Sequence, residues 1–392
     1  MYNLRQEIGE DITAFGQEVG LKESAKERPT LLFRADGNPK IGSGHIMRCL
    51  SIADAARKQG RRCLFVMADG HFARTVEENG HEVLVLHTDY TDMLSESGSM
   101  QELIRSSRPA ALFVDSYQVS PPYLAALQKA CQAENGVLVY IDDIMAFPCP
   151  CDILLNYNIY GPDQEPRYRE LYRMAGIASP RLLLGTAYVP LRAEFQNLPV
   201  RKVRRQAQKI LISTGGSDPE HVSLKLAQYI IKEKESFGAF SFHFVIGAMN
   251  SDREELKQLA ASHPFLILHS NVSYMQPLMS ACDVAISAAG STLYELCATQ
   301  TPAVTYILAD NQIPGAAGFA GRQLLCCAGD IRELGEDLAG LVLREAVNLA
   351  GDYERRVQTA ERQRAVVDGG GAGRILDRIF PDVSGAPENV FL

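Results

Sequence analysis

The sequence predicts a doubly wound α/β protein with two halves, each built on a parallel sheet. Two series of short apolar runs, rich in Val, Ile, Leu and Phe, are separated by stretches long enough for helices. This βαβ spacing indicates parallel strands that are covered on both faces. An irregular segment divides the two series, and a chain of 392 residues is long enough for two domains.

The apolar runs give the expected strands in order. The first series predicts strands at Leu31–Phe33, Cys63–Met67, Glu82–Leu86, Ala111–Val114, Val137–Ile141 and Asp152–Leu155. The second series predicts strands at Lys209–Ser213, Phe242–Ile246, Phe265–His269, Val284–Ile286 and Ala303–Ile307. Helical periodicity lies between them, for example over Glu220–Lys232 and Ser251–Ala261.

The predicted organisation has an appendage and two domains. Residues 1–29 form the appendage, residues 30–190 the first domain, and residues 191–392 the second domain with its C-terminal helices. The segment Asn158–Arg205 has little regular period, so we place the boundary near Gly185–Pro199. After Gly329 the pattern is helical, and the stretch DGGGAGRILDRIF could close a last helix across the other domain.

The composition excludes several classes of protein. A formal net charge of -8 argues against general binding to nucleic acid or to an anionic membrane. No apolar run approaches the ~18 residues that span a bilayer, and residues 1–29 lack a signal-peptide core, so we expect a cytoplasmic protein. The nine cysteines lack C-x-x-C spacing and are expected to be reduced, although the turn Cys149–Cys151 leaves a redox role open.

A glycine-rich loop follows the first predicted strand and leads into an amphipathic helix. Gly42 and Gly44 could let backbone N–H groups approach an anion, or could simply make a tight connection. His45 comes next, just inside the helix. The positive end of the helix dipole favours a neutral imidazole there, so His45 is a candidate base; a local capping or packing role is the alternative.

The second half repeats this arrangement after its first strand. Gly215 and Gly216 free the backbone, and Ser217 or Asp218 can cap a helix that begins with Pro219. Capping alone would explain the Ser-Asp-Pro part, but it would not explain the paired glycines.

The segment after the predicted strand Val284–Ile286 is the most informative one. Gly290, Ser291 and Thr292 are small or hydroxyl residues at a helix start, where a diphosphate can touch backbone N–H groups and hydroxyls. Glu295 has two interpretations. It completes a capping box with Thr292, or it accepts both hydroxyls of a ribose.

Further polar residues end other strands. Asn311 and Gln312 offer side-chain amides to sugar hydroxyls, although Asn311 is equally suited to a turn. Asp142 and Asp143 are adjacent acids that could hold a metal, but neighbouring positions on a strand point to opposite faces of the sheet. No histidine lies at metal-ligand spacing from them either, so we expect no metal site. The remaining groups are expected to line a cleft or cap loops: Asp36, Asp115, Asp142, Asp143 and Asn156.

These separated motifs together resemble a known family, the UDP-sugar hydrolases of pseudaminic acid biosynthesis called PseG and their spore-coat relatives called SpsG. The resemblance covers about Leu31 to Phe380, while residues 1–29 and the Gly/Ala-rich Ala316–Gly321 depart from it. The motifs that carry it are RADGNPKIGSGHIMRCLSIADA, VDSY, YIDDI, LLGTAYVPLRAEF, STGGSDP, AISAAGSTLYELCA, DNQ and VDGGGAGRI.

The resemblance implies two Rossmann-like domains in the glycosyltransferase-B architecture, similar to the MurG enzyme of peptidoglycan synthesis. It implies hydrolysis of UDP-2,4-diacetamido-2,4,6-trideoxy-β-L-altropyranose, with no cofactor and with inversion. By motif match, His45 is the base, Gly290, Ser291 and Thr292 contact the diphosphate, and Glu295 contacts the ribose.

One base suffices for such a reaction because UDP is already a good leaving group and does not need protonation. Two alternatives stay open at this point: a UDP-sugar-dependent glycosyltransferase of the same fold, and a nucleotide-sugar-binding protein without turnover. The sequence leaves the oligomeric state open.

Overall fold

The computed structural model describes residues 28–381 except 39, 238 and 248, and these residues form two units. Unit 1 contains residues 28–193 and 371–381, and unit 2 contains residues 194–370. The predicted boundary at 190/191 lies three residues from this division, and the last helix belongs to unit 1. Of the predicted appendage, residues 1–27 lie outside the described residues.

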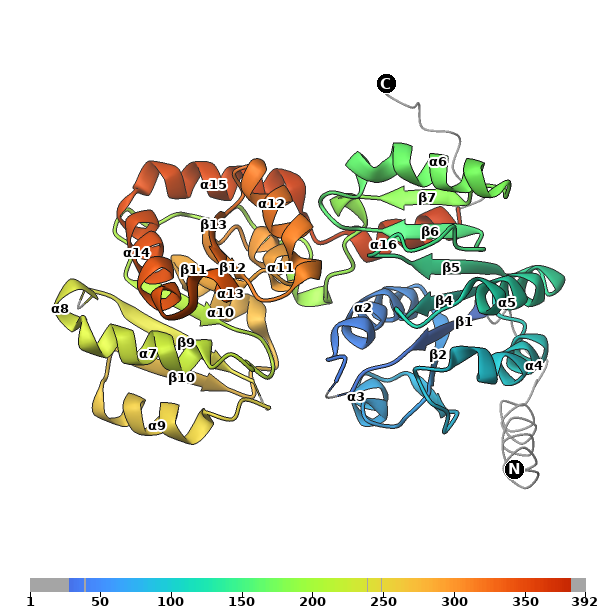
Figure 1. Ribbon diagram of the computed structural model, residues 1–392, viewed down its shortest axis with the longest axis horizontal. Coiled ribbons are helices and arrows are strands. Elements are labelled where there is room, and N and C mark those ends of the chain that lie inside the picture. The colour runs from blue at the N-terminus through green and yellow to red at the C-terminus, as the bar shows by residue number, and fades with distance from the viewer. Residues whose placement is uncertain (1–27, 39, 238, 248, 382–392) are drawn as a thin grey trace. The chain divides into compact units, whose positions relative to one another are not determined.

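Unit 1 is built on a seven-stranded parallel sheet in the order β3-β2-β1-β4-β5-β6-β7 (Figure 1). The strands are β1 (Arg28–Ala35), β2 (Arg61–Met67), β3 (Glu82–Val85), β4 (Ala111–Asp115), β5 (Val137–Ile141), β6 (Ile153–Asn156) and β7 (Arg181–Leu184). The chain order reverses between β1 and β4. Doubly wound sheets bind ligands at such a switch point, outside the carboxyl ends of the strands.

The helices of unit 1 cover both faces of this sheet. They are α2 (Gly44–Lys58), α3 (Ala73–Glu78), α4 (Ser97–Ser107), α5 (Pro121–Ala133), α6 (Glu165–Ala175) and α16 (Gly371–Ile379). Buried side chains of α4, α5 and α6 pack on one face, whereas α2 contacts β1, β2, β4 and α16. In the strands between, Phe33 stacks with Phe65 and Phe113 at centroid distances of 4.9 and 4.8 Å.

Unit 2 has a six-stranded parallel sheet in the order β10-β9-β8-β11-β12-β13. The strands are β8 (Lys209–Ser213), β9 (Ser241–Ile246), β10 (Leu266–Ser270), β11 (Val284–Ala288), β12 (Ala303–Ile307) and β13 (Cys326–Asp330). Its switch point lies between β8 and β11. The topology therefore places the loops after β8 and β11 where a ligand site is expected.

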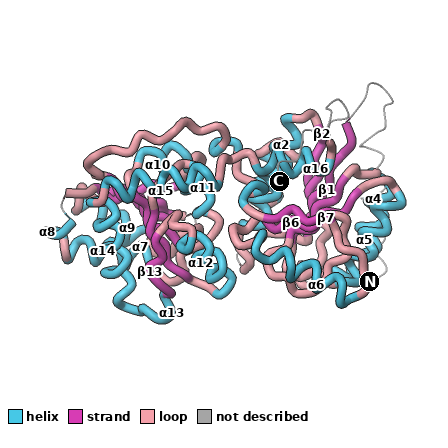
Figure 2. The backbone as a smooth tube through the Cα atoms, turned by 90° about the horizontal axis from the view of Figure 1, so that it is seen from above, coloured by secondary structure: helices cyan, strands magenta, loops and turns pink. Residues whose placement is uncertain are grey.

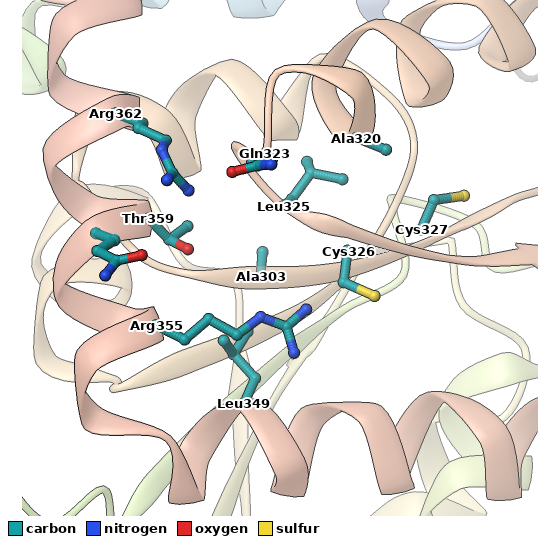
Figure 3. A pocket seen from close by; sticks show the side chains of 11 residues that line it. Ala303, Ala320, Gln323, Leu325, Cys326, Cys327, Leu349, Arg355, Thr359 and Arg362 are labelled. Carbon is teal, nitrogen blue, oxygen red and sulfur yellow. The ribbon is translucent and has the colours of Figure 1, made fainter.

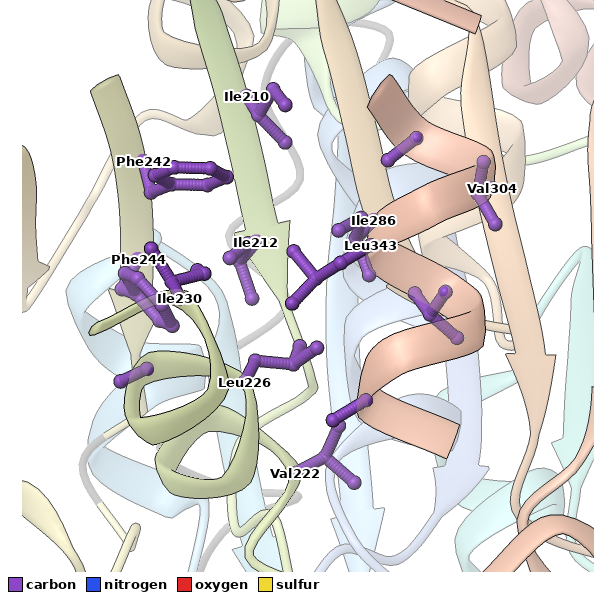
Figure 4. Close-up of a cluster of buried hydrophobic side chains, with 14 of the residues drawn as sticks. Ile210, Ile212, Val222, Leu226, Ile230, Phe242, Phe244, Ile286, Val304 and Leu343 are labelled. Atoms are coloured by element: carbon purple, nitrogen blue, oxygen red, sulfur yellow. The ribbon is translucent and has the colours of Figure 1, made fainter. Parts of the chain in front are cut away.

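The helices of unit 2 flank its sheet, as the tube in Figure 2 shows. They are α7 (Val222–Lys232), α8 (Lys234–Phe237), α9 (Arg253–Ser262), α10 (Met275–Ala281), α11 (Thr292–Ala298), α12 (Ile313–Gly321), α13 (Ile331–Leu334), α14 (Leu338–Gly351) and α15 (Tyr353–Val366). In Figure 4, Leu226 of α7 and Leu343 of α14 point toward Ile212 and Ile286 of the strands. These buried contacts fix one face of the sheet.

All eleven predicted strands are present, but the sequence analysis missed two edge strands and one helix. β7 and α6 lie in the segment that we interpreted as an irregular linker, and β13 lies between the last predicted strand and the region after Gly329 where we expected helix. β13 has the sequence CCAGD, in which a glycine and an aspartate leave almost no apolar pattern to detect. In the part of the chain that the structure describes, no helix is both long and apolar enough to span a membrane.

Candidate active site

The loop between β1 and α2 brings a tight turn to the carboxyl edge of the unit 1 sheet. The backbone carbonyl of Asn38 accepts the N–H of Gly42 (2.8 Å). The side-chain oxygen of Asn38 accepts the N–H groups of Lys40 and Ile41. Gly42 has a φ of 75°, which favours glycine. Gly44 has no positive φ, and a Cβ there would meet no atom within 4 Å, so packing does not require glycine at 44.

His45 is the second residue of α2, and the structure pairs it with a carboxylate. Its Nδ1 lies 2.6 Å from Oδ1 of Asp115, the last residue of β4. β4 is the neighbour of β1 in the sheet, so the switch point itself brings these residues together. The His45 side chain is 10% exposed and Asp115 is fully buried. The ring of Tyr117 meets the imidazole edge-on, with centroids 4.7 Å apart.

The charge of Asp115 decides which nitrogen of His45 carries a proton. Burial acts to raise the pKa of Asp115, but Arg48 and His45 outweigh it and hold that pKa well below its usual value. An ionised carboxylate can only accept hydrogen bonds, so Nδ1 of His45 must be the donor. In the neutral imidazole, Nε2 therefore carries the lone pair, and His45 is oriented as a base.

Arg48 lies one helical turn after His45 and joins two carboxylates. Its Nε and Nη2 donate to Oδ2 and Oδ1 of Asp115, and its Nη1 donates to Oδ2 of Asp143 over 2.6 Å. Nη1 also donates to the hydroxyl of Tyr157 over 2.9 Å. Burial lowers the pKa of Arg48, but the two carboxylates more than offset this and hold the pKa well above its ordinary value. Arg48 is thus a permanently charged group at the centre of the site.

Asp143 links this network to two further side chains. The Tyr117 hydroxyl donates to its Oδ2 (2.9 Å), and Nδ2 of Asn158 donates to its Oδ1 (3.0 Å). Burial, and then the charge of Asp143, raises the pKa of Tyr117, so this phenol stays protonated and can act as a hydrogen-bond donor.

The other polar residues that we predicted at these strand ends stabilise turns and strands. Asp142 accepts the N–H groups of Ile144 and Met145 and the hydroxyl of Tyr168, which closes the turn after β5. Asp36 accepts a 2.6 Å bond from Arg34 and the N–H of Ala68. Asn156 accepts the N–H of Asn158 and donates to the Tyr168 hydroxyl. Across residues 28–381, apart from the three undescribed positions, no group of three or more His, Cys, Asp or Glu side chains is arranged to hold a metal ion.

In unit 2, backbone geometry accounts for one of the two glycines of the loop after β8. Gly215 has a φ of 101°, which favours glycine. A Cβ on Gly216 would meet only the Met249 side chain, at 3.8 Å, whereas a Cβ on the neighbouring Gly247 would come within 2.1 Å of the Gly216 carbonyl oxygen, so the close approach requires glycine at 247. Asp218 caps α7 by accepting the N–H groups of Val222 (3.0 Å) and Ser223 (2.8 Å). The Asp218 carboxylate therefore satisfies the first N–H groups of α7, but the helix begins at Val222 rather than at Pro219, and its N-cap residue is His221.

The loop after β11 also contains a glycine that no contact among the described residues of unit 2 explains. Gly290 has no positive φ, and a Cβ on it would meet no atom within 4 Å. Ser291 is the N-cap of α11 and makes no side-chain capping bond; Thr292 is the first helical residue. Thr292 is therefore not an N-cap, and the capping-box interpretation of Glu295 loses its basis. Glu295 is half-buried in the first turn of α11.

The motif after β12 forms a short turn over Asp310–Gln312. Oε1 of Gln312 accepts the N–H of Leu308 (2.9 Å), so this oxygen stabilises the turn, and Asn311 is exposed. Since β8, β11 and β12 are neighbours, unit 2 brings the predicted loops together at one edge of its sheet: Gly215, Gly216, Gly290, Ser291, Thr292, Glu295, Asn311 and Gln312. In unit 1, Gly42, Gly44 and His45 lie together at the switch point.

Sequence reasoning missed the partners of His45. The sequence analysis gives Asp115 only as a strand-end carboxylate, it contains Arg48 and Tyr117 only as letters of the quoted motifs with no role, and it does not name Tyr157. A signal existed for Arg48, since it lies three positions after His45 and therefore on the same face of the helix.

Comparisons with known proteins found distant relatives. The chain is 25% identical over 265 residues to the UDP-2,4-diacetamido-2,4,6-trideoxy-β-L-altropyranose hydrolase of Campylobacter jejuni, covering 68% of this chain and 86% of that protein. It is 22% identical over 351 residues to the spore coat polysaccharide biosynthesis protein SpsG of Bacillus subtilis, covering 87% and 95%. A match of 24% to an uncharacterised protein of Methanocaldococcus jannaschii covers 71% of this chain and 55% of that protein. No family model matches the chain.

Solved structures share the fold at low sequence identity. A structure from Listeria monocytogenes, named as a candidate UDP-N-acetylglucosamine 2-epimerase, superposes with a TM-score of 0.61 at 13% identity, covering 94% of this chain and 100% of that one. The calicheamicin glycosyltransferase CalG4 gives 0.57 at 15% identity, covering 92% and 100%. With its two parallel-sheet α/β units, the chain therefore has the glycosyltransferase-B fold.

Proposed function

We propose that this protein is an enzyme of surface-polysaccharide biosynthesis that acts on a nucleotide sugar, and specifically that it hydrolyses UDP-2,4-diacetamido-2,4,6-trideoxy-β-L-altropyranose. The names of the Campylobacter and Bacillus relatives support the substrate class and the pathway. The observation that carries the chemistry is the 2.6 Å contact between Nδ1 of His45 and Asp115, because it leaves the lone pair of the neutral imidazole on Nε2, where it can act as a base.

In the proposed reaction, Nε2 of His45 takes a proton from water as the water oxygen bonds to the anomeric carbon. The bond between that carbon and the phosphate oxygen breaks, and its electron pair leaves with UDP. Attack opposite the leaving group inverts the anomeric centre. Asp115 stabilises the imidazolium that forms, and the ring of Tyr117, whose hydroxyl donates to Asp143, meets the imidazole edge-on and helps to fix its orientation.

We assign UDP binding to the loops of unit 2. The space above Gly290 supports an approach by the diphosphate to Gly290, Ser291 and Thr292, and Glu295 is our candidate for the ribose hydroxyls. Asn311 and Gln312 follow the neighbouring strand, with amide groups suited to sugar hydroxyls. Because UDP is a good leaving group, the reaction needs no metal to activate it, and we expect turnover with a chelator present.

The test is release of UDP from this substrate, without any acceptor and with chelator present, by the intact chain and by His45→Ala. The expected result is rapid release by the intact chain and a loss of about 100- to 10,000-fold in kcat for the variant, with UDP affinity retained. Full activity in His45→Ala would overturn the assigned base. UDP binding without release by the intact chain would overturn hydrolysis, and adding candidate acceptors would then test transfer.

A further inference from the structure

Unit 2 contains a second candidate site at the opposite edge of its sheet. A cavity of about 450 Å³ lies where β12 and β13 begin, whereas the loops assigned to UDP follow the ends of the strands (Figure 3). Small-molecule sites in proteins are typically about 300–1,000 Å³. Its floor is apolar and includes Ala303, Leu325 and Leu349. The cavity thus has the volume for a small organic molecule.

One face of α15 forms the polar wall of this cavity. Arg355, Gln358 and Arg362 are spaced three and four residues apart, which places them on the same side of the helix, and all three line the cavity. Figure 3 shows Arg355 and Arg362 extending from α15 into the space in front of the strands. The cavity therefore has two guanidinium groups on one wall.

The other face of α15 is fixed by buried hydrogen bonds. Arg356 donates to the carbonyls of Arg204 (2.8 Å) and Arg205 (2.9 Å), and Nε2 of Gln363 donates to the carbonyls of Thr301 and Leu324. These bonds hold the helix across the beginnings of the strands, so the backbone positions of the two arginines are set without any ligand.

The charge at this wall is not balanced by the protein. Within the described part of the chain, neither Arg355 nor Arg362 forms an ion pair, although the chain as a whole has a net charge of -8. Two carboxylates lie close to the cavity: Oε2 of Glu345 is 3.8 Å from Sγ of Cys326, and Oδ1 of Asp352 accepts the backbone N–H of Arg355. Neither carboxylate lines the cavity, whose lining includes two arginines and no acidic residue, so the lining itself has an excess of positive charge.

We propose that this cavity binds a small organic anion, with its phosphate or carboxylate group held by Arg355 and Arg362 and its carbon skeleton on the apolar floor. Guanidinium groups bind both oxyanions through paired N–H donors. The amides of Gln323 and Gln358 supply further polar contacts. Since the cavity lies at the edge of the sheet opposite the UDP loops, the anion is a second ligand and not the substrate.

Two cysteines in the cavity lining can be used to measure whether the cavity is occupied. Seven of its nine cysteines are buried, and the two that are partly exposed, Cys326 and Cys327, both line the cavity. The rate at which iodoacetamide alkylates these two thiols, followed by mass spectrometry of their peptide, therefore measures access to the cavity. Burial raises the pKa of both thiols, so the reaction is run at mildly alkaline pH.

The experiment uses the full chain with inorganic phosphate, with citrate, or with potassium chloride at matched ionic strength. We expect phosphate, citrate or both to slow alkylation several-fold in a saturable manner, and the anion that protects identifies the preferred oxyanion. Protection should be lost in the double variant Arg355→Gln/Arg362→Gln. It should be retained in Arg364→Gln, which changes an exposed arginine of α15 outside the cavity lining.

An alkylation rate that neither anion changes, or protection that persists in the double variant, would overturn the proposal. The readout does not involve turnover, so its failure would be independent of any failure of the proposed hydrolase activity.

Discussion

Arg48 donates a 2.6 Å hydrogen bond to Asp143, a residue 95 positions away that follows a different strand. The same guanidinium binds both oxygens of Asp115, so one cation neutralises two carboxylates that end β4 and follow β5. Arg48 therefore holds Asp115 in place, and Asp115 in turn orients His45. Arg48 can have this role without touching the substrate.

We expect Arg48→Met to destabilise unit 1 strongly. Removing one partner of a buried ion pair leaves an uncompensated charge, which typically costs about 3–5 kcal/mol of unfolding free energy. Urea unfolding followed by circular dichroism measures this loss. The control is Arg74→Met, whose partner Glu78 is exposed, and it should change the midpoint little. Equal, small effects in both variants would contradict a buried charge network.

The destabilisation by Arg48→Met should shrink in acid. In the wild type, the folded-state pKa of Asp115 is held below its unfolded value of about 3.9, so the ion pair stabilises the protein above that pH and is lost as the pH falls. Repeating the unfolding series from neutral to acidic pH should show the wild-type and variant curves converging. A difference that is constant down to the acid transition would argue that lost packing, rather than charge, causes the effect.

We expect Asp115→Asn to lower kcat with little change in UDP affinity. The amide keeps the shape of the side chain but removes the charge that stabilises a protonated His45, so most of the base contribution of about 100- to 10,000-fold should disappear. Steady-state rates of UDP release and the affinity for UDP measure the two effects separately. The matched variant Asp142→Asn changes a residue that closes a turn, so it should reduce stability more than kcat. The opposite ranking would remove Asp115 from the mechanism.

Two glycine substitutions separate ligand contact from packing in unit 2. Gly290→Ala meets no atom within 4 Å and requires no unusual backbone conformation, so it should leave stability unchanged or slightly raised while it weakens UDP binding. Gly247→Ala places a Cβ within 2.1 Å of the Gly216 carbonyl oxygen, so it should be destabilising. Calorimetry of UDP binding and thermal unfolding check both. If UDP affinity survives Gly290→Ala, our assignment of the diphosphate is wrong.

The stability of unit 2 should fall between about pH 6.5 and pH 4. His243 of β9 stacks on His269 of β10, and burial, His269 and Lys209 lower its pKa to about 4. The unfolded histidine binds a proton below about 6.5, so acid favours unfolding over this window, by about 1–2 kcal/mol after solvent screening. His243→Gln should flatten this part of the pH profile, and His71→Gln serves as the control for removing an exposed histidine. A wild-type slope in His243→Gln would exclude His243 as its source.

The sequence was sufficient for local features and insufficient for long-range pairing. The apolar runs located the strands, and the Gly42–Gly44 loop before an amphipathic helix located His45, because both signals lie within a few residues of chain. The pairing of His45 with Asp115 joins positions 70 apart, and only the strand order β1-β4 reveals it. Two edge strands escaped prediction for separate reasons. β7, with the sequence RLLL, is a four-residue run inside a segment without regular period, and β13, with the sequence CCAGD, has only small and partly exposed side chains.

The position of α16 determines the order in which the two units can complete their folding during translation. This helix packs against α2, Arg374 donates to the carbonyl of Ala187, and Gly371 approaches the carbonyl of Val189 so closely that a Cβ would lie 2.1 Å from it. Unit 2 is a continuous segment and can fold as soon as its residues have emerged from the ribosome, whereas unit 1 must wait for a helix that is translated after all of unit 2. The helix that carries His45 is thus covered only when translation has passed residue 379, so an incomplete nascent chain leaves that face of unit 1 open.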